Sequence, residues 1–350
     1  MSAAVFARSG RAFNTVINRI KVSAFFSCMI FFWGVSPLLT IAYTGYFLYN
    51  GISSVGLGIM AMYAVWYAYS FHWPSSGGMI DNALSRYMRE RWFLSRWAGE
   101  YLEHSIVKTA ELPTDRNYLI GCHPHGFVGM GFNLCNSCQR RDFRDLFPGI
   151  SQVATTLSGN FFWPLRREFA MLYGVLDCSK KSINYFLGHP DKGKAVCVLI
   201  GGLNEAIATT NGKFFLKMKG RKGFAKAALE NGASLVPLFN FGENELFTDL
   251  AVKDMERLRN MQARLRTHVP FLPPMAVGRS TLGLPWGGAL PNPGPVTSVV
   301  GAPIDVQKVE KPTQEQIDAV YDRYCASLVE LFEEHKGNYG VPEKENLIFY

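Results

Sequence analysis

The sequence predicts an α/β domain with a central, mostly parallel sheet, preceded by an N-terminal hydrophobic helical hairpin. From about residue 90 onward, short apolar or β-branched runs alternate with segments of helical pattern, as strands and helices do in a parallel sheet. Before that, residues 22–80 contain no Asp, Glu, Lys or Arg. We therefore divide the chain into a basic N-terminus at residues 1–21, a hairpin at 22–80 and a folded domain at 81–350.

The hairpin is predicted from its length and its flanking charges. A spanning helix needs about 20 apolar residues, so Val22–Thr44 and Ser53–Phe71 fit two passes joined by an uncharged turn at Tyr49-Asn50-Gly51. Basic residues flank both outer ends: Arg8, Arg11, Arg19 and Lys21 before it, and Arg86, Arg89, Arg91 and Arg96 after it. By the positive-inside rule, both ends of the hairpin face the cytosol.

Two alternatives stay open for this region. Pro37 lies within the first pass and favours a kink or a shallow re-entrant hairpin over two straight helices, and the sequence does not separate these. A cleaved signal peptide fits less well, because the apolar core is too long and a second apolar segment follows it.

Five short runs are predicted as strands of the sheet: Asn117–Cys122, Gln152–Leu157, Ala195–Ile200, Ser234–Phe239 and Val296–Gly301. The clearest helix begins after Thr313, where Thr313-x-x-Gln316 resembles a capping box, and Gly337 follows its end. Its core-facing residues recur at helical spacing: Ile317, Val320, Tyr321, Tyr324, Leu328, Leu331 and Phe332.

Composition limits the partners and the compartment. The formal net charge of +8 suggests anionic partners, such as phosphates or anionic lipid headgroups. Seven scattered cysteines suggest a reducing compartment, and Cys135-x-x-Cys138 lacks the second half of a zinc motif, so we expect packing thiols. Residues 266–295, with seven prolines and five glycines, are predicted as a wall over an apolar substrate or the membrane face, or as a plain connection.

The segment Tyr118-Leu-Ile-Gly-Cys-His123-Pro-His125-Gly126 ends an apolar run at two histidines. Such a run predicts a buried strand that delivers its last side chains to a loop, where catalytic groups are common. His123 and His125 are two residues apart, so in extended backbone they would project to the same side. A neutral histidine can take a proton from a hydroxyl while that oxygen attacks an acyl carbon. For at least one of the pair we expect a structural role instead.

Other chemistries fit this motif less well. Gly126-x-x-Gly129-x-Gly131 has the wrong order for a dinucleotide fingerprint, and no G-x-S-x-G nucleophile elbow occurs in the chain. The two histidines lack the i, i+4 spacing and the nearby third ligand of a metal site. General-base catalysis is the chemistry that remains.

A second cluster follows at Gly201-Gly202-Leu-Asn-Glu205, where a predicted strand ends in two glycines and a carboxylate. Glu205 could orient the histidine through its second ring nitrogen, as a triad acid does, or cap the next helix. Five cations then occur within ten residues: Lys213, Lys217, Lys219, Arg221 and Lys222. They fit a ligand rich in phosphate or a membrane-facing surface, whereas a nucleic-acid site would need aromatic stacking platforms that are missing there.

The motifs occur in one order along the chain: His123-Pro-His125-Gly126, Phe147-Pro-Gly149, Asn160-Phe-Phe-Trp-Pro164-Leu-Arg166-Arg167-Glu168, Gly201-Gly202-x-x-Glu205, Arg221-Lys-Gly223-Phe224, and Phe241-Gly242-Glu243-Asn244. This ordered set resembles the type-2 diacylglycerol acyltransferase family, which also includes monoacylglycerol and wax alcohol acyltransferases. The resemblance covers the chain from about Arg86 to Tyr350, and the hairpin also fits it.

The resemblance implies transfer of a fatty acyl group from acyl-CoA to the hydroxyl of a neutral lipid. We expect diacylglycerol as the acceptor, with monoacylglycerol or a long-chain alcohol as alternatives. The expected location is the endoplasmic reticulum membrane, with both termini cytosolic, and lipid droplets. Acyl-CoA is then a co-substrate, and no permanently bound cofactor or metal is expected. The bilayer is a partner, nucleic acid is not, and a homo-oligomer is compatible with the sequence.

The same resemblance suggests roles for single residues. His125 would act as the general base, helped or replaced by His123, and Glu205 would orient or tune it. More distant glycerolipid acyltransferases have an Asp after four further residues, where this chain has Val128 or Met130, so Glu205 is the remote substitute. Cations from two regions would hold the coenzyme A phosphates: Arg166, Arg167, Lys213, Lys217, Lys219, Arg221 and Lys222.

Two rival hypotheses come from other classes. A non-catalytic hairpin protein that coats lipid droplets would explain residues 22–80 but not the ordered polar motifs. A metal-dependent lipid hydrolase would use the histidines as ligands and water as the acceptor.

Overall fold

The computed structural model describes residues 16–136, 143–250, 257, 260–262, 264, 276–281 and 287–350. Cys138 of the Cys135-x-x-Cys138 pair and parts of the segment at 266–295 lie outside the described residues.

The helices and helical turns are, in chain order, α2 (Val16–Ile30), the π-helical η1 (Phe31–Val35), α3 (Ser36–Asn50), α4 (Ser54–Tyr69), α5 (Trp73–Ser76), α6 (Ala83–Glu90), α7 (Phe93–Tyr101), α8 (Met130–Cys135), α9 (Phe143–Leu146), η2 (Ser158–Phe161), α10 (Arg166–Leu172), α11 (Lys180–Leu187), α12 (Gly202–Ala208), α13 (Gly223–Asn231), η3 (Glu243–Glu245), α15 (Gln314–His335) and η4 (Lys336–Tyr339). The strands are β1 (Ser105–Lys108), β2 (Tyr118–His123), β3 (Ser151–Thr156), β4 (Val175–Asp177), β5 (Lys194–Leu199), β6 (Phe214–Leu216), β7 (Ser234–Phe241), β8 (Thr248–Asp249), β9 (Ala276–Val277), β10 (Thr297–Val300) and β11 (Leu347–Phe349).

A seven-stranded sheet forms the centre of the domain, in the order β1-β10-β7-β2-β5-β3-β4. Among these described strands every neighbouring pair is parallel except β10 with β7. The predicted mostly parallel sheet is therefore confirmed, and the five predicted strands coincide with β2, β3, β5, β7 and β10 to within about two residues. The edge strands β1 and β4 were not predicted.

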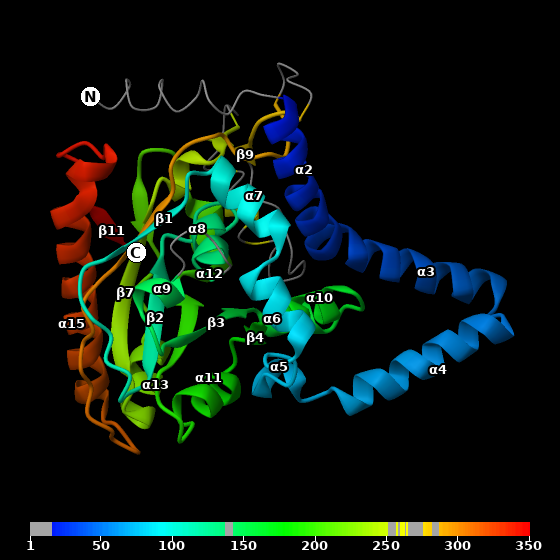
Figure 1. Ribbon diagram of the computed structural model, residues 1–350, viewed down its shortest axis with the longest axis horizontal. Coiled ribbons are helices and arrows are strands. Elements are labelled where there is room, and N and C mark those ends of the chain that lie inside the picture. The colour runs from blue at the N-terminus through cyan, green and yellow to red at the C-terminus, as the bar shows by residue number, and fades with distance from the viewer. Residues whose placement is uncertain are drawn as a thin grey trace.

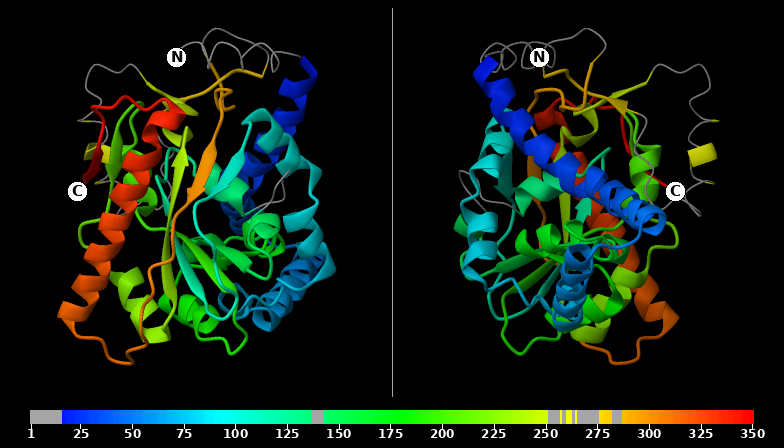
Figure 2. Two further views of the ribbon diagram at one scale, coloured as in Figure 1. Left: turned by 60° about the vertical axis from the view of Figure 1, so that its left-hand side comes forward. Right: turned by 90° about the vertical axis from the view of Figure 1, so that its right-hand side faces the viewer.

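Helices cover both faces of the sheet. Along β2, Tyr118 and Ile120 point into a core shared with α2, α7 and α8, whereas Leu119 points into a core shared with α13 and α15. Figure 2 shows α15 and α2 on opposite sides of the sheet. The predicted capping box of α15 is present, because Thr313 and Gln316 bond to each other's backbone amides.

The N-terminal helix is only partly a free apolar segment. Asn18–Asn50 is a run of 33 helical residues with mean hydropathy 1.8, the one described helix long and apolar enough to cross a membrane. Its first half packs on α7, with Val22 and Phe25 almost completely buried in the domain core. One side of α2 is therefore packed against protein, while Ile20 and Ile30 on the same helix are exposed. The predicted first pass at Val22–Thr44 lies within this helical run.

The helix bends where Pro37 follows the π-helical turn η1 (Figure 1). Proline has no amide hydrogen, so the carbonyl of Trp33, four residues earlier, loses its helical partner. The guanidinium of Arg166 donates to that carbonyl and, at 3.3 Å, to the carbonyl of Phe32. The predicted kink at Pro37 is thus held by a buried arginine from α10.

Beyond the bend, α3 and α4 project away from the domain as a hairpin (Figure 1). At its tip Leu48 is 83% exposed and Tyr49 is 90% exposed. Other large apolar side chains along its two arms are also exposed: Leu38, Leu39, Ile41, Tyr43, Tyr46, Ile52, Val55, Leu57, Ile59, Met60, Met62, Val65 and Tyr69. The two arms of the hairpin, α3 and α4, lie within the predicted 22–80, and near its end α4 contacts the domain through Tyr63 and Trp66, which bond to Glu168.

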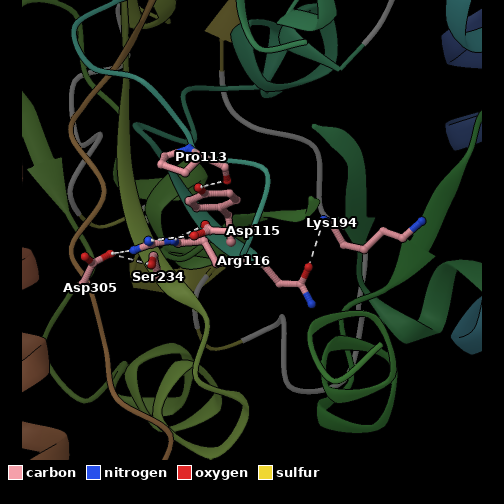
Figure 3. Close-up of polar contacts among 8 residues, drawn as sticks. Pro113, Asp115, Arg116, Lys194, Ser234 and Asp305 are labelled. Atoms are coloured by element: carbon pink, nitrogen blue, oxygen red, sulfur yellow. Dashed lines mark hydrogen bonds and ion pairs between the residues drawn. The ribbon is translucent and has the colours of Figure 1, made fainter. Parts of the chain in front are cut away.

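Polar contacts fix the amino-terminal edge of the sheet (Figure 3). The side-chain oxygen of Asn117 accepts the Lys194 amide hydrogen at 3.0 Å, joining the starts of β2 and β5. Arg116 lies 2.7 Å from the carboxylate of Asp305, which also accepts the hydroxyl hydrogen of Ser234 at 2.9 Å. With this edge fixed, the other edge presents the loops that follow β2, β3 and β5.

Candidate active site

His123 and His125 follow one another at the end of β2 but have separate environments. His123 is fully buried, and its Nε2 lies 3.0 Å from the hydroxyl of Tyr324, which donates to the carbonyl of Gly121 at 3.1 Å. Its Nδ1 has no hydrogen-bond partner among the described residues. Burial lowers the pKa of His123 to about 3, so this ring is a neutral part of the core under α15.

His125 lies beyond the end of the strand and is half-buried. Its Nδ1 lies 3.1 Å from the carbonyl oxygen of Gly126. Because a carbonyl can only accept, Nδ1 carries the hydrogen and Nε2 keeps its lone pair. Burial lowers the pKa of His125 below its ordinary value, which favours the neutral ring. His125 therefore has the tautomer of a general base.

Glu205 holds the backbone of this loop. Its buried carboxylate accepts the His125 amide hydrogen at 2.5 Å through Oε1 and the Lys217 amide hydrogen at 2.9 Å through Oε2. A Cβ on Gly201 would lie 1.9 Å from Oε2, so glycine is needed there. Burial raises the pKa of Glu205 to about 7, opposed by the two amides. The predicted contact of Glu205 with the imidazole is thus replaced by a contact with the His125 backbone.

Glu243 holds the other end of the same loop. It is buried after β7, and its carboxylate accepts the amide hydrogens of Met130 at 2.9 Å and Gly131 at 2.6 Å. A Cβ on Gly126 would lie 2.4 Å from Cγ of Glu243. Burial raises the pKa of Glu243 to about 7. Sequence reasoning gave Glu243 no role, although its position directly after a fully buried strand was a usable signal.

The basic segment 213–222 runs beside Glu205, since Lys217 bonds to it through the backbone. Lys213 lies 2.9 Å from Glu345, and Lys222 lies 2.7 Å from Asp318. The ammonium of Lys217 lies 4.9 Å from the ring centre of Tyr350. The structure describes no ion pair for Lys219, which is exposed, while Arg221 is close enough to help hold down the pKa of Glu205 against the larger effect of burial.

Arg166 and Arg167 do not fit the predicted contacts with phosphates. Arg166 is 4% exposed and bonds to helix carbonyls and to Asn160 Oδ1 at 3.0 Å. Arg167 is 1% exposed and donates to the Ser70 carbonyl at 2.6 Å and to Glu168 at 3.0 Å. Both arginines join α10 to the N-terminal helices, so their charges are already used within the protein.

Among the described residues, no group of three or more His, Cys, Asp and Glu side chains is placed to hold a metal ion.

Comparison with known proteins identifies the class. The family model described as diacylglycerol acyltransferase matches residues 48–350. Diacylglycerol O-acyltransferase 2 from Rattus norvegicus is 35% identical over 336 residues, covering 95% of this chain and 85% of its own. Human 2-acylglycerol O-acyltransferase 3 is 38% identical over 288 residues, covering 82% of this chain and 83% of its own.

The chain therefore belongs to the diacylglycerol acyltransferase family and is an acyltransferase, as its ordered motifs predicted. Among solved structures, the 1-acyl-sn-glycerophosphate acyltransferase PlsC from Thermotoga maritima matches 78% of this chain and 96% of its own, with 14% identity and a TM-score of 0.38.

Proposed function

We propose that this protein transfers a fatty acyl group from acyl-CoA to the hydroxyl of diacylglycerol, giving triacylglycerol and free coenzyme A. The observation that carries this proposal is the neutral His125 at the end of β2, with Nδ1–H given to a carbonyl and Nε2 left to accept a proton. The relatives named diacylglycerol O-acyltransferase 2 support the choice of acceptor.

The chemistry needs one base and no covalent enzyme intermediate. His125 Nε2 takes the hydroxyl proton as the acceptor oxygen forms its bond to the thioester carbonyl carbon. The carbon–sulfur bond then breaks, and the leaving thiolate, whose conjugate thiol has a pKa of about 8.5, takes up the proton held on His125 Nε2, which restores the neutral ring. The lowered pKa of His125 keeps its ring neutral before each turnover.

Other residues position this base. Glu205 and Glu243 hold the two ends of the loop that carries His125, through backbone amides at positions 125, 130 and 131. His123 supports the end of β2 from within the core through Tyr324. We assign His123 a structural role and not that of an alternative base.

The coenzyme A phosphates would meet the basic segment beside Glu205. Lys217, Lys219 and Arg221 are the cations of this segment that remain for a ligand, because Lys213 and Lys222 are paired with Glu345 and Asp318. These cations lie next to the backbone that Glu205 links to His125, which would put the thioester end of a bound acyl-CoA within reach of the base.

The α3–α4 hairpin would anchor the enzyme in the membrane of the endoplasmic reticulum and on lipid droplets. Its arms of 15 and 16 residues are about 22 and 24 Å long at about 1.5 Å per residue, shorter than the hydrocarbon core of about 30 Å. These lengths favour a re-entrant hairpin that enters from the cytosolic side and returns to it.

Monoacylglycerol is a second candidate acceptor, because relatives named 2-acylglycerol O-acyltransferase are as similar as the diacylglycerol enzymes. The test is to assay purified enzyme with one radiolabelled acyl-CoA against diacylglycerol, monoacylglycerol and a long-chain alcohol in parallel. We expect the highest kcat/KM with diacylglycerol. A higher value with either of the other acceptors would overturn that assignment, and release of free fatty acid without an acylated product would overturn the acyltransferase mechanism.

A further inference from the structure

The uncharged segment Leu157–Leu165 is exposed at the same edge of the sheet as His125. We infer that this segment is a second lipid-contacting surface, which docks the catalytic domain on the bilayer that the hairpin enters. The inference rests on the proposed membrane insertion of the hairpin and adds a contact made by the domain itself.

Three large apolar side chains of the segment face solvent in the isolated protein. Leu157 is 52% exposed, Phe162 is 69% exposed and Leu165 is 48% exposed. No charged residue lies between them in the sequence. Exposed apolar side chains that cluster in one short segment mark a surface that another apolar phase covers.

The backbone of Leu165 gives independent support. Leu165 has φ of 67°, a conformation that non-glycine residues adopt only when the surroundings enforce it. The enforcing contact is Glu168, whose carboxylate accepts the Leu165 amide hydrogen at 2.9 Å. The fold thus maintains an unfavourable backbone at a residue whose side chain contributes little to the core. The contact with Glu168 holds the exposed Leu165 side chain in a fixed position, where it is available for an external contact.

Glu168 also ties this segment to the hairpin. Its carboxylate accepts hydrogen bonds from the Tyr63 hydroxyl at 3.2 Å and from the Trp66 indole at 3.1 Å, both on α4. The same carboxylate that shapes Leu165 therefore fixes the segment against the hairpin. Figure 1 shows α10, which follows the segment, beside the N-terminal helices.

Lipid is the partner that this arrangement fits. Glu168 bonds both to the backbone of Leu165 and to two side chains of α4, so a bilayer that receives the hairpin would lie next to the segment. Leu157 directly follows β3, which is parallel to β5 and β2, so the segment and the His125 loop share one edge of the sheet. Docking there would let an acceptor with long acyl chains reach His125 without leaving the lipid.

Photocrosslinking tests the contact directly. The full-length protein is placed in phosphatidylcholine vesicles that carry diazirine-labelled acyl chains, and adducts are mapped by mass spectrometry after irradiation. We expect adducts within 157–165 and within the hairpin, and none at Val329, which is 37% exposed on α15 on the far side of the domain. Adducts on the hairpin without any on 157–165 would overturn this inference alone. If adducts are found neither on the hairpin nor on 157–165, the proposed membrane insertion of the hairpin is overturned as well.

A pair of variants tests the consequence for activity. Phe162→Glu combined with Leu165→Glu should raise the KM for long-chain diacylglycerol in vesicles about tenfold, because charged side chains resist entry into lipid. The rate with a short-chain diacylglycerol in detergent micelles should stay near that of the parent enzyme. Val329→Glu is the matched control and should change neither assay. An equal loss in vesicles and micelles, or no loss in vesicles, would contradict the inference.

Discussion

At the residue scale, the two histidines of one short motif have different partners and different uses. His123 is enclosed in the core with Tyr324, and His125 lies in a loop whose amides are held by carboxylates. The sequence predicted a structural role for at least one of the pair but not which one, because that depends on where β2 ends and on α15, about 200 residues later. The sequence predicted that Glu205 interacts with His125, but it did not predict that the Glu205 carboxylate bonds to the His125 backbone amide instead of the ring.

Glu243 gives a residue-scale prediction about pH. Its folded pKa of about 7 is above the ordinary 4.5, so the native state binds a proton that the unfolded chain does not bind between these values. Stability from this group is therefore gained as pH falls through 7 and lost as pH rises. Between pH 8 and pH 6.5, the titration of Glu243 should change the free energy of unfolding by slightly less than about 1 kcal/mol.

In the Glu243→Gln variant this contribution to the pH dependence of the free energy of unfolding should be lost. Chemical denaturation in detergent at pH 8 and at pH 6.5 measures the free energy of unfolding of the variant and the parent. Glu330→Gln, at an exposed carboxylate on α15, is the control and should leave the dependence as it is. Identical pH dependence in the Glu243 variant and the parent would contradict a buried, titrating Glu243.

At the element scale, the motif Arg166-Arg167-Glu168 connects α10 to the N-terminal helices. Its charge suggested phosphate binding, because sequence alone cannot distinguish a buried arginine from an exposed one. The structural reason for the burial is local: the bend before α3 and the end of α4 leave carbonyls at Phe32, Trp33 and Ser70 that need donors.

Arg167→Ala should destabilise the protein by about 2 kcal/mol, because it removes charged hydrogen bonds to the Ser70 carbonyl and to Glu168. The thermal unfolding midpoint in detergent measures the effect. Arg96→Ala is the control, since Arg96 forms an exposed pair with Glu100, and it should change stability by less than about 1 kcal/mol. Equal shifts of the unfolding midpoint in the two variants would show that the hydrogen bonds of Arg167 to the end of α4 do not stabilise the protein.

The basic segment provides a second element-scale prediction. Lys219→Ala combined with Arg221→Ala should raise the KM for acyl-CoA several-fold and reduce its dependence on salt, with kcat little changed. Lys213→Ala, which removes a cation already paired with Glu345, should have a smaller effect on KM. Steady-state kinetics at low and high salt measure both effects. An increase in KM for the Lys213 variant as large as that of the double variant would contradict a specific role of Lys219 and Arg221 in binding acyl-CoA.

At the scale of the whole molecule, the sequence predicted the sheet and an apolar N-terminal region, but not which part of that region packs against the domain. Absence of charge is equally compatible with burial in protein, as for α2, and with exposure to lipid, as we propose for α3 and α4. The distinction depends on α7 and α10, which supply the protein surface against α2 and η1. The short strands β1, β4, β6 and β11 were missed because their register comes from long-range neighbours.

The short arms of the hairpin make a prediction about topology. In sealed microsomes, a Ser53→Cys variant should resist a membrane-impermeant maleimide both from outside and after access to the lumen, because the turn stays inside the bilayer. A membrane-permeant maleimide should label it more than the parent protein, whose native cysteines give the background. Labelling of Ser53→Cys by the impermeant reagent from the lumen would indicate two spanning helices and contradict the re-entrant hairpin.

The central claim is that His125, and not His123, is the general base. The direct measurement is acyl transfer from radiolabelled acyl-CoA by purified His125→Ala and His123→Gln variants, with correct folding of each checked by its unfolding transition. We predict that His125→Ala loses about 100-fold or more in kcat, the usual contribution of a general base, while His123→Gln keeps most of its turnover and loses stability. Parent-like turnover in His125→Ala would contradict the account.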